Sequence, residues 1–122
     1  MLPKNQRLRL SQDFTATVRS GARTGRRNVV LYARIRTDEP QGNNRFGFIV
    51  SKAVGNAVHR NLVKRRMRVL AAQFTAEAIG LDVVVRALPG SSDITWDELS
   101  QQVRSALGSV LQKAGAKHEK GL

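Results

Sequence analysis

The chain contains no cysteine, and acidic residues are scarce in it. Without cysteine it can form no disulfide, no thiolate metal site and no cysteine nucleophile. Its two histidines, His59 and His118, lie too far apart in the sequence to suggest a metal centre. We therefore expect no metal-binding residue and no cysteine nucleophile in this chain.

Long apolar runs are also missing from the sequence. None approaches the roughly 20 residues that a membrane-spanning helix needs, and the first ten residues lack the apolar core of a signal peptide. We expect a cytoplasmic protein without a membrane partner. The 122 residues fit one domain. We place that domain at residues 1–115 and a flexible tail at residues 116–122, because the end of the chain is rich in glycine and charge.

Positive charge is the strongest feature that the sequence does have. Lysine and arginine total 21 against 9 acidic residues, which gives a net charge of +12. No acid lies between Glu39 and Glu77, although basic residues recur throughout that stretch. Such an excess opposes compactness through self-repulsion, so the composition favours a polyanionic partner. A solvated surface that only maintains solubility is the alternative.

The pattern of apolar residues and chain breakers predicts three helices and four strands. The helices are expected at Ser11–Ser20 (capped by Ser11 and ended by Gly21), from Asn56 to about Ala78, and from a Thr95 capping box to about Ala114. The strands are expected at Ala22–Arg27, Asn28–Arg36, Arg45–Ser51 and Leu81–Arg86. This order, helix–strands–helix–strand–helix, indicates an α/β (α+β) sandwich of helices on one sheet.

The helix after Asn56 separates into two faces on a helical wheel. One face is a core stripe and the other a ladder of cations that no acid relieves. The stripe consists of Val63, Met67, Leu70 and Phe74, and the ladder of Arg60, Lys64 and Arg68. Phosphates would supply the missing counter-charge, and arginines bind them through forked hydrogen bonds. The pattern therefore predicts a nucleic-acid surface, with a merely solvated face as the alternative.

The segment from Ser51 to Arg68 narrows the choice of nucleic acid. It reads Ser-Lys, then Gly-Asn-Ala-Val, then Arg60-Asn61 followed by Lys-Arg-x-x-Arg. This closely resembles the signature of the bacterial ribonuclease P protein family, and the similarity extends over roughly residues 5 to 115. One position departs from the family motif, because Leu62 stands where the family has a second arginine. We expect one RNA contact fewer there, with Arg66 compensating in part.

The resemblance implies both a fold and a division of labour. The fold would be a four-stranded mixed sheet with an unusual left-handed βαβ crossover. The protein would be the protein subunit of ribonuclease P, one copy bound to one catalytic RNA. That RNA would use Mg²⁺ to remove the 5′ leader of precursor tRNA, and the protein alone would hold no cofactor. The activity would thus be that of an endoribonuclease whose active site lies in the RNA.

The resemblance also implies two sets of contact residues. Contacts to the RNA subunit are expected from Asn56, Arg60, Asn61, Lys64, Arg65, Arg66 and Arg68. Leader contacts are expected from Phe14, Val18, Tyr32, Phe48, Val50, Lys52 and Arg86. We expect the apolar members of this second set to face one another in a cleft between the first helix and the sheet. The alternative is that they pack in the core.

Two other functions remain to be separated from this one. A ribosomal or ribonucleoprotein-assembly protein would share the charge and the basic helix. A self-sufficient nuclease would need carboxylates gathered at one site, whereas the acids here are scattered along the sequence.

Overall fold

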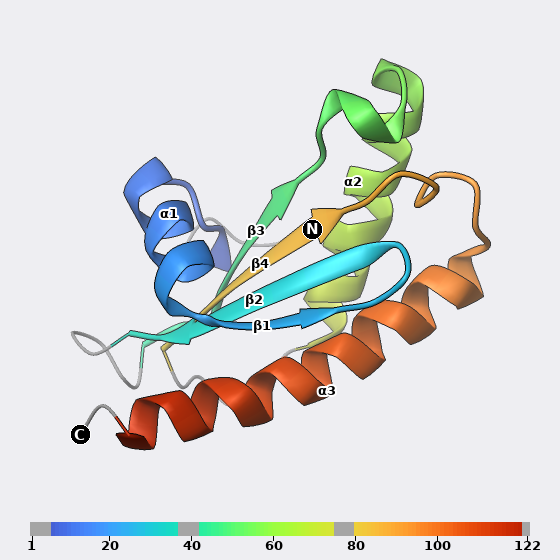
Figure 1. The fold of residues 1–122 in the computed structure, drawn as a ribbon. Coiled ribbons are helices and arrows are strands. Elements are labelled where there is room, and N and C mark those ends of the chain that lie inside the picture. Colours follow the sequence, from blue (N-terminus) through green and yellow to red (C-terminus); the bar gives the residue numbers. More distant parts are fainter. Residues whose placement is uncertain (1–5, 37–41, 75–79, 121–122) are drawn as a thin grey trace.

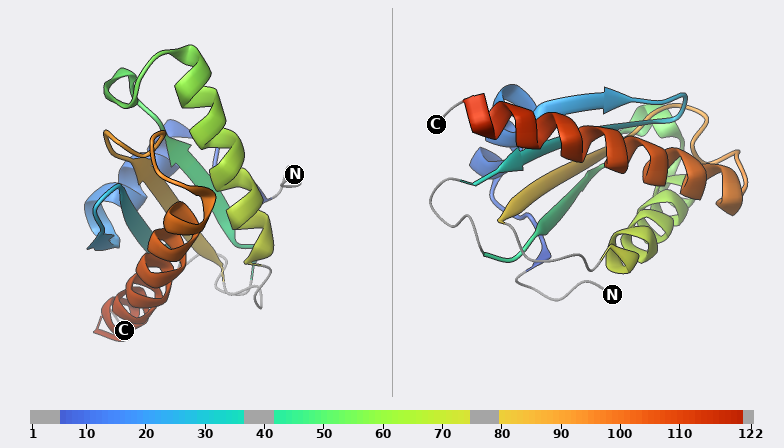
Figure 2. Two further views of the ribbon diagram at one scale, coloured as in Figure 1. Left: turned by 90° about the vertical axis from the view of Figure 1, so that its right-hand side faces the viewer. Right: turned by 90° about the horizontal axis from the view of Figure 1, so that it is seen from below.

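The computed structural model describes residues 6–36, 42–74 and 80–120 (Figure 1). A four-stranded sheet lies between one helix on one face and two helices on the other (Figure 2). In chain order the elements are α1 (Ser11–Ser20), β1 (Ala22–Gly25), β2 (Val29–Ile35), β3 (Arg45–Ile49), the 3₁₀ turn η2 (Lys52–Val54), α2 (Ala57–Gln73), β4 (Leu81–Ala87) and α3 (Trp96–Lys120).

The strands lie in the order β1-β2-β4-β3, so β1 and β3 form the two edges of the sheet. β1 pairs with β2 and β2 with β4 in antiparallel fashion, whereas β3 and β4 are parallel. Helix α2 connects these two parallel neighbours. Viewed with both strands pointing up and α2 in front, β4 lies to the left of β3 (Figures 1 and 2). The crossover is therefore left-handed, as the resemblance implied and against the usual rule.

The main core fills the space between the sheet and helices α2 and α3. Alternate residues of β2 and β4, such as Leu31 and Val85, meet Met67 of α2 and Leu99 of α3 there. The predicted core stripe of α2 is confirmed, with Val63, Met67 and Leu70 almost completely buried and Phe74 packed at the margin. Burial of this apolar area is the main force that holds the layers together.

A smaller apolar cluster, the α1 cluster, lies on the opposite face of the sheet. Its buried members come from the N-terminal segment, β2 and β4, and residues of α1 pack against them; the cluster comprises Leu8, Val30, Tyr32 and Val84 with the half-buried Phe14, Val18, Ile49 and Leu88. The N-terminal segment is held beside β3, because the Leu8 amide donates to the Phe46 carbonyl at 2.9 Å. This second cluster fixes the position of α1.

Helix α1 has the predicted bounds but not the predicted cap. Leu10 is the N-cap residue, and no side chain caps the helix. Gly21 follows the last turn in an extended conformation. A Cβ at Gly21 would clash with the Thr17 carbonyl oxygen in the last turn of α1 and would lie 2.6 Å from the Ala33 carbonyl oxygen of β2. The glycine is therefore needed for the close approach of the chain to β2 and not for a left-handed turn.

Two helix ends differ from prediction. Helix α2 ends at Gln73 and not near Ala78, because Phe74 leaves the helical conformation (φ −91°, ψ 66°) and packs against the main core; residues 75–79 lie outside the described residues. Helix α3 continues past Gly115 to Lys120. A single glycine costs a helix only about 1 kcal/mol, too little to end it.

Among the described residues, no helix is both long and apolar enough to cross a bilayer.

Candidate nucleic-acid interface

Helix α2 begins where the sequence predicted. Gly55 adopts a φ of 149°, which favours glycine, and turns the chain out of η2. Asn56 then caps the helix, since its side-chain oxygen accepts a hydrogen bond from the His59 amide at 3.1 Å. Asn56 therefore has a structural role in addition to the RNA contact predicted for it.

The cationic ladder of α2 lies on the side of the helix away from the main core. Arg65 and Arg68 are exposed, and Arg60 and Lys64 are half-buried. None of the ion pairs found among residues 6–36, 42–74 and 80–120 includes any of these four side chains. Their charges are thus left for an external anion to balance, which is the arrangement of a phosphate-binding surface.

The ladder borders a shallow hollow of about 490 Å³, which we call the α2 hollow. It is lined by Asn61, Lys64, Arg65, Arg68 and Val69. Four of these residues belong to the set predicted to contact RNA, and the structure brings them to one place. Val69 was not predicted, although it is 45% exposed and thus one of the few large apolar side chains of the described residues that face solvent.

Arg66 differs from the other predicted RNA contacts. Its Nη1 donates to the Ile94 carbonyl at 3.0 Å, which ties α2 to the loop before α3. Arg66 is therefore partly engaged within the protein.

Leu62, which stands where the family motif has a second arginine, is half-buried and does not line the α2 hollow.

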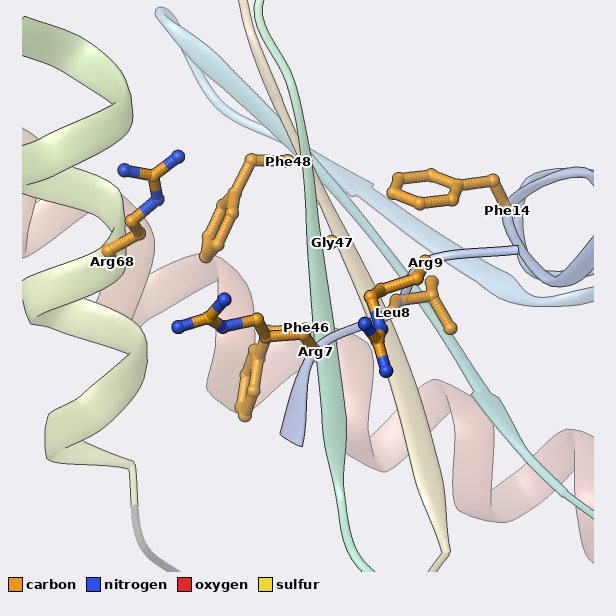
Figure 3. Close-up of a pocket in the computed structure, with 8 residues that line it drawn as sticks. All are labelled: Arg7, Leu8, Arg9, Phe14, Phe46, Gly47, Phe48 and Arg68. Carbon is orange, nitrogen blue, oxygen red and sulfur yellow. The ribbon is translucent and has the colours of Figure 1, made fainter. Parts of the chain in front are cut away.

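A second hollow of about 330 Å³, the β3 groove, lies at the edge of the sheet (Figure 3). Phe48 and Arg68 border it on the α2 side of β3, and Phe14 borders it on the α1 side (Figure 3). Its lining comprises Arg7, Leu8, Arg9, Phe14, Phe46, Gly47, Phe48 and Arg68. Phe14 and Phe48 are half-buried, so part of each ring is accessible beside the arginines. Accessible aromatic surface next to arginines is typical of sites that stack single-stranded bases.

Gly47 allows the ring of Phe14 to lie directly on the backbone of β3. A Cβ at this position would be 2.6 Å from Cε1 of Phe14 and 3.1 Å from Cβ of Leu8. Any side chain at position 47 would therefore displace the ring. The sequence indicated the strand but gave no reason to expect this contact.

The predicted cleft between α1 and the sheet was wrong for two of its five apolar members, Phe48 and Val50, whereas Phe14, Val18 and Tyr32 do meet. Tyr32 is only 8% exposed and packs in the α1 cluster with Phe14 and Val18, so the space between α1 and β2 is filled at this point. Phe48 and Val50 lie on the other face, against the main core. Side chains alternate along a strand, and the face of β3 that carries Phe48, and on which Val50 follows directly after the strand, is not the face that α1 covers.

The two predicted cations at strand ends are exposed. Lys52 lies in η2, just after β3, and Arg86 lies near the end of β4. Arg86 is in register with Ile49 of β3, a member of the α1 cluster, and so it projects from the α1 face of the sheet. Both stay predictions as leader contacts.

A buried ionic cluster, absent from the predictions, lies at the start of β4. The fully buried Asp82 accepts hydrogen bonds from Arg36 Nη1, from Nε and Nη2 of Arg45 at 2.8 and 2.9 Å, and from Arg34 Nη2 at 3.2 Å. Arg45 also pairs with Asp13 of α1 at 3.5 Å. Burial alone would raise the pKa of Asp82, but the hydrogen bonds and charges of Arg45 and Arg36 hold it below its ordinary value.

Comparison with known proteins gives one consistent result. A family model described as Ribonuclease P matches residues 2–111. The "Ribonuclease P protein component" of Kocuria rhizophila is 53% identical, over 93% of this chain and 98% of the relative. The protein of the same name from Pseudarthrobacter chlorophenolicus is 52% identical, over 98% of this chain and 88% of the relative. The structure resembles the RNase P protein of Staphylococcus aureus with a TM-score of 0.77 and 27% identity, over 86% of this chain and 94% of that one.

Proposed function

The chain belongs to the ribonuclease P protein family, and from this premise we propose that it is the protein subunit of a ribonuclease P that removes the 5′ leader from precursor tRNA. The observation that carries the proposal is the ladder on α2, whose three cations, together with Arg65 beside them, have no acidic partner among the described residues. A polyanion of fixed geometry, such as a folded RNA, satisfies such a ladder.

We assign the chemistry to the RNA subunit and the binding to this chain. Mg²⁺ held by the RNA would stabilise the charge that develops on the phosphodiester during hydrolysis. Within the described ranges, no three histidine, aspartate or glutamate side chains gather as metal ligands. The buried Asp82 is surrounded by arginines, so it serves the fold and is not available as a general base.

The two hollows divide the binding between them. The α2 hollow and its ladder would contact the RNA subunit through phosphates. The β3 groove would receive the leader, because Phe14 and Phe48 offer ring surface that tolerates any base. Leaders differ in sequence from one tRNA to the next, so stacking without base readout suits this substrate. We further propose a 1:1 complex with the RNA, located in the cytoplasm.

Reconstitution tests the proposal directly. The purified chain alone is expected to leave precursor tRNA intact, and addition of ribonuclease P RNA with Mg²⁺ is expected to give cleavage at the mature 5′ end. The chain should also increase the affinity of the RNA enzyme for substrates that carry a leader. If it leaves that affinity unchanged, or binds a ribosomal RNA fragment equally well, it is a general RNA-binding protein instead.

Variants of the ladder test the assigned surface. Arg60→Ala and Arg68→Ala should each weaken binding to the RNA subunit. Each should also reduce the slope of log K against log salt by about 0.7–0.9, the value for one lost phosphate contact. Arg19→Ala is the matched control, because Arg19 is an exposed arginine on α1, across the sheet from α2. Equal losses in all three variants would contradict the assignment to α2.

A further inference from the structure

We propose that the α2 hollow seats one unpaired nucleotide of the bound RNA, and that it reads both the base and the phosphate. This inference rests on the proposed function, since it takes RNA as the partner of α2. It goes further because a ladder of cations by itself would bind any phosphate backbone. The added element is that the hollow contains groups suited to a base.

The lining of the hollow forms two parallel rows on the helix. Asn61, Arg65 and Val69 are spaced at i, i+4 and i+8, and Lys64 and Arg68 form the adjacent row. Residues with this spacing lie along one side of an α-helix, and eight residues rise by about 12 Å. A polar amide, cations and an apolar side chain are thus presented in order along one elongated surface.

Each kind of group in the hollow matches one part of a nucleotide. The cations suit a phosphate. Asn61 is the one lining side chain that can accept a hydrogen bond as well as donate, so it can pair with the edge of a base. Val69, which is 45% exposed, offers an apolar surface on which a base can pack. The hollow, at about 490 Å³, falls within the roughly 300–1,000 Å³ of ordinary small-ligand sites.

The nucleotide must be unpaired for this contact to form. In an A-form helix the bases are stacked, so the shallow minor groove offers base edges but no base face that could pack on Val69. A base in a loop, bulge or single-stranded end can turn outward and meet Asn61 and Val69 together. We place this nucleotide in the RNA subunit, the partner proposed for the α2 hollow, and the experiment distinguishes it from a nucleotide of the precursor tRNA.

The chain provides a matched control in Val58. It is 75% exposed on the same helix, yet it does not line the hollow. Val69→Ala and Val58→Ala remove the same two methyl groups from solvent-facing positions, so neither should disturb folding, and thermal melting of each variant would verify this. A difference between them in RNA binding would therefore report on the hollow.

The experiment measures the affinity of the full-length chain for the RNA subunit and, separately, for precursor tRNA in the reconstituted enzyme, over a range of salt concentrations. Val69→Ala is expected to weaken binding to the RNA subunit by about five- to tenfold, the effect of two methyl groups withdrawn from apolar contact. An effect on precursor tRNA alone would contradict the RNA subunit as the source of the nucleotide. The salt dependence should stay unchanged, because no phosphate contact is lost. Asn61→Ala should behave in the same way, and Val58→Ala should bind as the parent does.

Chemical probing of the affected RNA should show one unpaired nucleotide that the parent chain protects and Val69→Ala exposes. The inference is overturned if Val69→Ala and Val58→Ala bind alike, or if Asn61→Ala and Val69→Ala change the salt slope. In those cases Arg65→Ala and Arg68→Ala would still lower both affinity and slope, and the proposed function would stand. If Arg65→Ala and Arg68→Ala also had no effect, the proposed function itself would fall.

Discussion

Replacement of Asp82 by asparagine should be one of the most damaging single changes in this protein. The carboxylate is completely buried and accepts hydrogen bonds from three arginines, of which Arg36 is itself only 5% exposed. Asparagine has nearly the same shape, so the variant creates no cavity. It removes the negative charge and replaces one of the two acceptor oxygens by an NH₂ group, a donor that faces the arginine donors.

The expected cost follows from this burial. Removal of one partner from a buried ion pair typically costs about 3–5 kcal/mol, because the remaining charge is desolvated and unpaired. Domains of this size are stable by about 5–15 kcal/mol in total. We therefore expect Asp82→Asn to lower the melting temperature by about 9–30 °C, at roughly 3–6 °C per kcal/mol for a chain of this length.

The pH dependence of stability gives a second, independent signature. The pKa of Asp82 is lowered in the folded protein by Arg45 and Arg36 against the opposing effect of burial. Its contribution to stability is therefore complete above the unfolded pKa of about 3.9 and is lost as the pH falls through the lower folded value. Urea unfolding at several pH values below 5 should show a steeper loss for the parent than for Asp82→Asn.

Asp13→Asn serves as the control for this prediction. Asp13 also pairs with Arg45, but at 3.5 Å and from a partly exposed position. Exposed or partly exposed pairs contribute about 0–1 kcal/mol, so this variant should melt within a few degrees of the parent. Two results would refute this account of Asp82. One is that Asp82→Asn lowers the melting temperature no more than Asp13→Asn does. The other is that the parent and Asp82→Asn lose stability in parallel below pH 4.

Three further predictions concern the groove and the surface charge. Phe14→Ala should weaken the binding of precursors with long leaders and spare leaderless ones; equal losses would exclude the β3 groove as the leader site. Gly47→Ala should displace Phe14, lower stability by about 1–3 kcal/mol through overpacking and reduce leader affinity. Gly25→Ala meets no atom within 4 Å, so unfolding and binding assays should place it close to the parent. Sulfate should raise the melting temperature of the free chain by mass action, and less so in Arg68→Ala; an equal rise would place the anion elsewhere.

Local patterns in the sequence identified most elements but could not establish how they face one another. The alternation in β3 correctly separated Phe46, Phe48 and Val50 from Gly47 and Ile49. The side that α1 covers depends on the strand order β1-β2-β4-β3, which no local pattern contains. For this reason the predicted cleft combined residues from both faces of the sheet. The open site lies at the edge of β3 instead.

Asp82 illustrates a signal that the sequence did contain. A single acid inside an otherwise apolar strand, Leu-Asp-Val-Val-Val, is rarely tolerated without a partner. In a chain so rich in arginine, that partner could have been expected to be basic. Its identity could not be inferred, because Arg34, Arg36 and Arg45 reach Asp82 only through the pairing of β4 with both β2 and β3.

The ionic cluster and the groove are linked through β3. Arg45, which holds Asp82, is directly followed by Phe46, Gly47 and Phe48, the three residues through which the strand lines the groove. Arg45 also reaches Asp13, the neighbour of Phe14 on α1. One buried carboxylate thus fixes the start of the strand and, through Arg45, the helix that carries the opposing ring. Loss of Asp82 should therefore reduce leader affinity even where the protein stays folded, whereas a ladder variant such as Arg60→Ala should not affect stability.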